Sequence, residues 1–211
     1  MRGRIASSFG LRAAGRGAYS VKQGGAKRQG ESAPPALIRH DRRASLPYNG
    51  AMLEVRFYHL TRRTLEEALP RLLEMSLARS WRVAVQTGDA ARLKALDDHL
   101  WSYDPEKFLP HGTKADGEPE TQPIYLTAED DNPNEADVRF FVHGAAVAPL
   151  LADPAAAPKL RAVLMFDGSD PQELGEARAQ WKALHEAKYE LLYLQESEDG
   201  KWEEKARQKG A

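Results

Sequence analysis

The chain has 211 residues, enough for one domain with a sizeable core but short for two full domains. Its 30 basic and 31 acidic residues nearly cancel, and it has no cysteine, which excludes disulfides, thiolate zinc sites and cysteine nucleophiles and suits a reducing cytoplasm. No apolar run approaches the roughly 18 residues that a membrane span needs, so we expect no membrane association.

Residues 1–51 differ in composition from the rest of the chain. They hold ten Lys or Arg residues against two acids, which leaves 20 basic and 29 acidic residues after position 51. This extension, rich in Arg, Ser, Gly and Ala, has the composition of an organelle transit peptide or of a disordered basic arm. A third interpretation, which we favour, is that translation starts at Met52, where a strand-like run begins. In each case we expect disorder before Met52 and a single folded domain over residues 52–211.

The first elements of this domain are a strand, a helix, a second strand and a second helix. Residues 53–60 alternate in the manner of a half-buried strand. Leucines at three-, four- and seven-residue spacings then predict an amphipathic helix, with Thr64 and Glu67 forming a capping box. Pro70 should kink this helix or shift its start. Two further elements follow: a strand over residues 81–87 and a helix over residues 90–100.

Residues 100–112, LWSYDPEKFLPHG, place aromatic side chains in a segment that two prolines and a glycine keep irregular. We expect the irregularity to continue as a polar loop through residues 112–122. These side chains either pack the loop against the core of its own domain or form a surface that binds a partner. We expect Trp101 to be largely buried at the helix end and Phe108 to be more exposed.

The second half of the domain continues the alternation of strands and helices. The predicted elements are strands over residues 124–127, 137–143 and 160–166, a helical turn over residues 147–151, a helix over residues 171–189, and a hairpin over residues 190–195 and 201–205. Such alternation with short connections predicts an α/β, Rossmann-like fold: a largely parallel sheet with helices on both faces, plus a C-terminal hairpin.

Motifs for catalysis or cofactor binding are missing from the sequence. The turn after the first strand, residues 60–64, contains no glycine, so neither a Walker A nor a GxGxxG pattern exists. The histidines show no zinc-protease spacing, although His59 and His143 with Asp167 form a conceivable two-histidine site. We therefore expect no catalytic residue, cofactor or metal. The alternative is a small Rossmann-like enzyme that uses a nucleotide or a metal.

The helix over residues 171–189 carries a basic and aromatic stripe. Four side chains fall within an arc of roughly 100° on this helix: Arg178, Trp181, Lys182 and His185. A guanidinium and an ammonium can hold carboxylates, and an indole beside them offers an apolar floor. The stripe fits an acidic peptide that ends in an aromatic residue. It equally fits a solvated face with Trp181 in the core.

The segment from Leu100 to Gly112 resembles the motif "LW...P..FLPH" of the chi subunit of bacterial DNA polymerase III. The order of elements from Met52 to about Tyr193 also resembles that family. The resemblance implies a non-catalytic accessory subunit of the replicative polymerase in the cytoplasm. Such a subunit links the clamp loader to single-stranded DNA-binding protein by binding the acidic C-terminal tail of that protein. If the basic arm is a true transit peptide, the protein is instead mitochondrial.

The resemblance also implies roles for particular residues. Arg178 and Lys182 would bind carboxylates of the tail, and Trp181 with Phe166 would line the pocket for its terminal phenylalanine. Leu174 stands where the family can carry a further Lys. Four residues would contact the clamp loader through a psi-like subunit: Trp101, Phe108, Pro110 and His111. Because the domain after position 51 is acidic, we expect no direct DNA binding by it.

Overall fold

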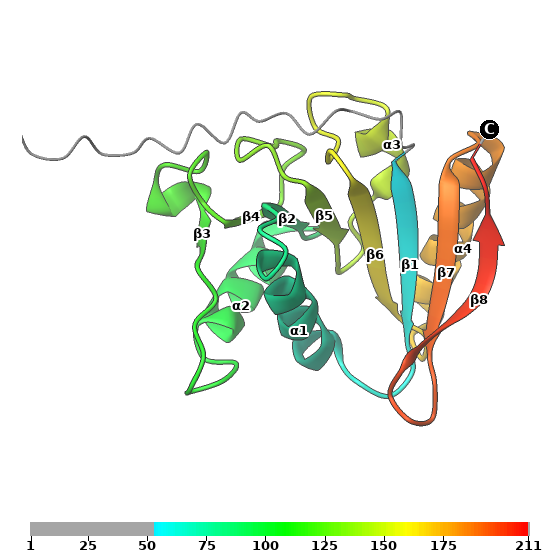
Figure 1. Cartoon of the computed structure of the whole chain (residues 1–211), viewed down its shortest axis with the longest axis horizontal. Helices are drawn as coiled ribbons and strands as arrows, with labels where there is room; N and C mark the ends of the chain where they lie inside the picture. The colour runs from blue at the N-terminus through cyan, green and yellow to red at the C-terminus, as the bar shows by residue number, and fades with distance from the viewer. Residues whose placement is uncertain (1–52, 211) are drawn as a thin grey trace, which may run out of the picture. The chain divides into compact units, whose positions relative to one another are not determined.

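The computed structural model describes residues 53–210, so the predicted basic extension and the predicted start at Met52 lie outside the described residues. Within the described part, the strands form one eight-stranded sheet flanked by helices (Figure 1). The strands are β1 (Glu54–Leu60), β2 (Val83–Gln86), β3 (His111–Thr113), β4 (Ile124–Thr127), β5 (Val138–Phe141), β6 (Arg161–Asp167), β7 (Glu190–Glu196) and β8 (Trp202–Gln208). The helices are α1 (Leu65–Leu77), α2 (Ala90–Leu100), the 3-10 turn η1 (Lys114–Asp116), α3 (Val147–Leu151) and α4 (Pro171–Glu186).

The sheet is parallel except at its C-terminal edge. Its strand order is β3-β4-β2-β5-β6-β1-β7-β8, in which β1 pairs in parallel with both β6 and β7. The last pair, β7 with β8, is antiparallel and forms the predicted hairpin. The predicted α/β class, with a largely parallel sheet and a C-terminal hairpin, is confirmed.

Helices cover both faces of the sheet, as the alternation of strands and helices predicted (Figure 1). On one face α1 and α2 bury their leucines against a core that includes Tyr58 and Leu60 of β1. On the other face α3 and α4 pack against a core that includes Val55 and Phe57 of the same strand. The alternation of β1 therefore supplies apolar side chains to two cores, because successive strand residues point to opposite faces.

The segment after Pro110 is more regular than the sequence predicts. His111–Thr113 form β3, which pairs in parallel with β4 at the edge of the sheet, and Lys114–Asp116 form the turn η1. The prediction of an irregular loop was wrong here. A three-residue strand with a central glycine has no detectable alternation, so only its pairing with β4 defines it.

Helix α1 begins at the predicted capping box and runs without interruption through Pro70. The Thr64 side chain accepts from the N–H of Glu67, and the Glu67 side chain accepts from the N–H of Thr64. Pro70 has no N–H, so the carbonyl of Glu66 lacks its helical donor. Nε2 of His99 on α2 lies 3.0 Å from this carbonyl and donates to it. The start of the helix is therefore not shifted, because a neighbouring helix supplies the missing donor.

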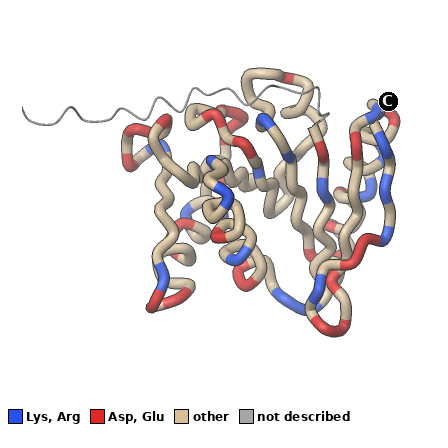
Figure 2. The backbone as a smooth tube through the Cα atoms, viewed as in Figure 1, with Lys and Arg blue, Asp and Glu red and all other residues tan. Residues whose placement is uncertain are grey.

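Strand β8 is an edge strand whose residues are mostly exposed. Figure 2 shows charges of both signs along it, and such charges discourage pairing of the free edge with another chain. Among the described residues, no helix combines the length and the apolar character needed to cross a membrane.

Candidate functional site

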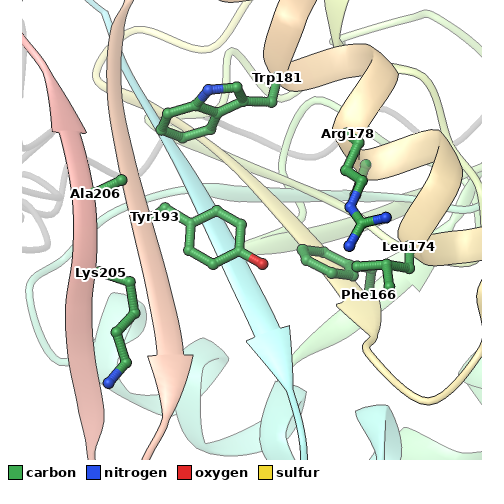
Figure 3. Close-up of a pocket in the computed structure, with 8 residues that line it drawn as sticks. Phe166, Leu174, Arg178, Trp181, Tyr193, Lys205 and Ala206 are labelled. Atoms are coloured by element: carbon green, nitrogen blue, oxygen red, sulfur yellow. The ribbon is translucent and has the colours of Figure 1, made fainter.

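A pocket of about 440 Å³ opens between α4 and the C-terminal hairpin, on the face of the sheet that α4 covers (Figure 3). It is lined by residues of β6, α4, β7 and β8: Phe166, Leu174, Ala177, Arg178, Trp181, Tyr193, Lys205 and Ala206. Most of these side chains are apolar. Helix α4 is fixed beside the pocket by its N-cap, because Asp170 accepts from the N–H groups of Gln172 and Glu173 and Pro171 occupies the first turn.

Aromatic rings form the floor of this pocket. The indole of Trp181 meets the ring of Phe57 edge-on, with centroids 5.1 Å apart, and meets Tyr193 in the same way at 5.7 Å. Phe166 is buried near the end of β6. Since three strands and α4 hold these rings, the floor is formed before any ligand binds, which reduces the entropy cost of binding.

His59 contacts two of the rings that form the floor, those of Phe166 and Tyr193. Its ring stacks on Phe166 at 5.1 Å, and its Nδ1 lies 2.9 Å from the hydroxyl of Tyr193. Burial lowers the pKa of His59 and outweighs the nearby Asp167 carboxylate, which acts to raise it, while the positive charge of Arg178 acts in the same direction as burial. A Cβ at Gly168 would lie 1.7 Å from Nε2 of His59, so only glycine fits there. His59 is therefore a tightly packed structural residue.

Arg178 is the cation at the mouth of the pocket. It is exposed on α4, and Figure 3 shows its guanidinium pointing from the helix toward Phe166. Within residues 53–210 it makes no hydrogen bond and no ion pair with a carboxylate. A guanidinium without a partner beside an aromatic floor can hold a carboxylate in two parallel hydrogen bonds.

The structure brings together three of the four residues predicted for this site. Phe166, Arg178 and Trp181 line the pocket, whereas Lys182 is exposed and does not line it. The sequence reasoning missed Tyr193, although the alternation of β7 places it on the same face as Leu191, toward α4. It also missed Lys205 and Ala206, for which the sequence carries no signal.

A second surface gathers the residues of the LW...P..FLPH segment. Trp101 is 61% exposed and Phe108 is 68% exposed, with ring centroids 5.9 Å apart. The prediction that Trp101 is largely buried was wrong. Leu100 at the end of α2 points into the core, so Trp101, the C-cap residue, points toward solvent. The two rings form a small exposed aromatic patch.

The other two residues predicted for this surface are less accessible. Pro110 is half-buried, and the His111 side chain is fully buried. Nδ1 of His111 donates to the carbonyl of Leu109 at 2.7 Å, and Nε2 lies 3.3 Å from Asp97 on α2. Burial raises the pKa of the Asp97 carboxyl. His111 thus anchors the segment beneath Trp101, with ring centroids 4.8 Å apart, instead of facing a partner.

The loop between β1 and α1 is where a nucleotide-binding α/β protein holds phosphate. Here the Glu196 carboxylate of β7 accepts from the backbone N–H groups of Arg62 and Arg63, each at 3.2 Å, and from the Arg63 guanidinium. A second cavity of about 410 Å³ adjoins this loop. Within the described residues, no group of three or more His, Asp or Glu side chains is arranged to hold a metal ion.

Comparison with known proteins gives a matching family and a similar relative. The model of the family described as "DNA polymerase III chi subunit, HolC" matches residues 52–192. The "Probable DNA polymerase III subunit chi" of Rickettsia prowazekii (strain Madrid E) is 33% identical over 100 residues. This alignment covers 47% of the present chain and 61% of the relative, so the chain spans less than two thirds of the relative's length. Tyr193 and all of β8 lie beyond the family match.

Proposed function

Because the chain belongs to the DNA polymerase III chi subunit family, we propose that it is a non-catalytic accessory subunit of the bacterial replicative polymerase, acting in the cytoplasm. We further propose that it links the clamp loader to single-stranded DNA-binding protein, whose acidic C-terminal tail it binds. The β1–α1 loop supports a non-catalytic role, because a carboxylate of the chain itself uses the N–H groups that a nucleotide phosphate would need.

The observation that carries tail binding is the free guanidinium of Arg178 beside a preformed aromatic pocket. A peptide that ends in phenylalanine has an aromatic ring and a carboxylate on the same residue. The ring can enter between Trp181 and Phe166 while the carboxylate meets Arg178. Acidic residues upstream add attraction to the positive mouth of the pocket.

The test is a titration of the full chain with a short peptide that ends in Asp-Asp-Pro-Phe and has a free carboxyl terminus. We expect saturable binding that weakens as salt is added, because partly exposed ion pairs are screened. A peptide with the same composition in scrambled order, without the terminal phenylalanine, is the control. Equal binding of the two peptides would rule out a site for the tail.

Arg178→Ala should weaken binding of this peptide by about 1–3 kcal/mol, roughly 5- to 150-fold in Kd. The charge-assisted bonds to the terminal carboxylate are lost, while folding is unaffected because the side chain is exposed and has no ion-pair partner among the described residues. The measurement is calorimetry with two peptides, one with a free carboxyl terminus and one with an amide. Wild type should prefer the free carboxylate, and the variant should not distinguish the two peptides.

Lys182→Ala is the matched comparison for this prediction. Lys182 lies on the same helix but outside the lining, so its loss should cost only about 0.2–1 kcal/mol, as for an exposed ion pair. If Lys182→Ala weakens binding more than Arg178→Ala does, the terminal carboxylate does not bind at Arg178. If neither variant changes the affinity, the pocket is not the tail site.

For the clamp loader, we propose that Trp101 and Phe108 form the contact surface, with Pro110 and His111 supporting it from within. Exposed Trp and Phe side chains that lie together are typical of the centres of protein interfaces. The segment is held in place by buried Leu109 and by His111, so the two rings are presented without being part of the main core.

Replacing Trp101 or Phe108 with serine should change the free energy of unfolding by less than about 0.5–1 kcal/mol, because both side chains are mostly exposed. Each change should abolish recovery of clamp-loader subunits in a pull-down with the tagged chain. Leu160→Ser is the control, since Leu160 is 47% exposed and lies beside β6, four strands away from β3. Serine variants that still recover the clamp loader would exclude this surface.

A further inference from the structure

A β-bulge in the C-terminal hairpin places Lys205 on the wall of the pocket. In the pairing of β7 with β8, Leu194 lies opposite Glu204 and Tyr193 lies opposite Ala206. Lys205 is therefore an extra residue that has no residue of β7 opposite it. In a regular strand, Lys205 and Ala206 would point to opposite faces of the sheet. Both line the pocket opposite α4, because the bulge turns them to the same side.

The hairpin that carries Lys205 is anchored from the other face of the sheet. Trp202 packs edge-on against Tyr58 of β1, with ring centroids 4.6 Å apart. The Arg63 guanidinium lies 5.5 Å from the centroid of Trp202 and also pairs with Glu196. These contacts fix the start of β8, so the wall that bears Lys205 is held in place across from α4.

The pocket therefore has a cation on each side of its aromatic floor. Arg178 stands on α4, and Lys205 stands on β8, with Tyr193 between them (Figure 3). Lys205 pairs with Glu203 at 2.8 Å, but both side chains are about half exposed, at 46% and 52%. An ion pair this exposed contributes little, so Lys205 can exchange Glu203 for another carboxylate at small cost.

We propose that Lys205 is a second anion-binding residue of this pocket, and that it selects ligands with an acidic side chain shortly before their terminal aromatic residue. The proposal rests on the proposed function. The terminal carboxylate binds at Arg178, the aromatic ring fills the floor, and the preceding chain crosses β7 toward β8. The acidic side chain then displaces Glu203 from Lys205. This contact belongs to the hairpin beyond the family match, which ends at residue 192.

The experiment compares Lys205→Gln with Lys201→Gln, which removes the same charge from the turn of the same hairpin, away from the pocket lining. Each variant is titrated with the Asp-Asp-Pro-Phe peptide and with its Asn-Asn-Pro-Phe counterpart. Lys205→Gln should lower the affinity for the acidic peptide about three- to fivefold and leave the affinity for the neutral peptide unchanged. Lys201→Gln should affect neither. Glu203→Gln should raise the affinity for the acidic peptide, because it removes the carboxylate that competes for Lys205.

The outcomes separate the inference from the function on which it rests. If Lys205→Gln behaves as Lys201→Gln does while Arg178→Ala still loses affinity, the pocket binds the tail and Lys205 plays no part. If Lys205→Gln weakens both peptides equally, the lysine acts by packing and selects no acidic residue, which also overturns the inference. If the wild-type chain binds neither peptide, both the function and the inference fail.

Discussion

Replacing Arg139 with alanine should destabilise the protein by about 3–5 kcal/mol, since three carbonyls, one buried and two partly buried, would lose their donor at once. Arg139 is fully buried on β5. Its guanidinium donates to four oxygens: the side chain of Gln86 (3.1 Å) and the carbonyls of Glu129 (2.9 Å), Asp131 (2.6 Å) and Ala156 (3.3 Å). Burial lowers the pKa of Arg139 to about 10, so it stays charged at neutral pH. One side chain therefore fixes two loops.

The measurement is urea denaturation of wild type and variant, with the midpoint and the slope both reported. Arg71→Ala is the control, because Arg71 is exposed on α1 and its loss should stay within about 0.5 kcal/mol. A loss below about 1 kcal/mol for Arg139→Ala would mean that water replaces the guanidinium at these carbonyls.

Replacing Glu196 with alanine should cost about 2–4 kcal/mol and loosen the hairpin. The carboxylate is fully buried and accepts from Arg62 N–H, Arg63 N–H and the Arg63 guanidinium, so its loss leaves three donors without an acceptor. Because the hairpin carries Tyr193 and Lys205, affinity for the acidic peptide should fall as well. Hydrogen exchange of the β8 amides should become faster in the variant, while that of β2 amides changes only with global stability.

The same carboxylate predicts a dependence on pH. Burial disfavours its charge, but the hydrogen bonds from Arg63 and Arg62 outweigh burial and hold the pKa of Glu196 below its ordinary value of 4.5. Its contribution is therefore present above pH 4.5 and is lost as the pH falls through the lower folded pKa. Melting temperatures between pH 6 and pH 3 should fall less steeply in Glu196→Ala than in wild type. Glu198→Gln, in the exposed turn, should follow wild type.

Most elements, though not the short strand β3, could be predicted from the sequence because each is specified by neighbours in the chain. The capping box of Thr64 with Glu67 starts α1, and Asp170 followed by Pro171 starts α4. The hairpin was predicted over residues 190–195 and 201–205, and the turn between its strands contains Gly200, which takes a φ of 73° that favours glycine. The alternation of residues 53–60 predicted a half-buried strand, whereas the structure buries apolar side chains of β1 on both faces of the sheet.

The aromatic segment shows where such local reasoning fails. Its composition predicted an irregular surface, but which rings face solvent depends on what packs beneath them. Leu109 and His111 fill the available space against α2, so Trp101 remains outside although it follows directly on buried Leu100. Arg139 is a similar case, because no short-range pattern indicates that a strand arginine will donate to three carbonyls in two loops.

For the pocket, the sequence by itself determined the stripe of Arg178 and Trp181 on one helix face, because helical periodicity depends only on spacing. Only the tertiary structure decided which residues lie across the pocket from this stripe. His59 and Tyr193 meet across 134 residues of chain, and Lys205 reaches the pocket because the pairing of β7 with β8 shifts by one residue. Successive side chains of a strand point to opposite faces of the sheet, so a single bulge changes which side chains line a site. That shift arises from the pairing of two strands and leaves no periodic signal in either of them.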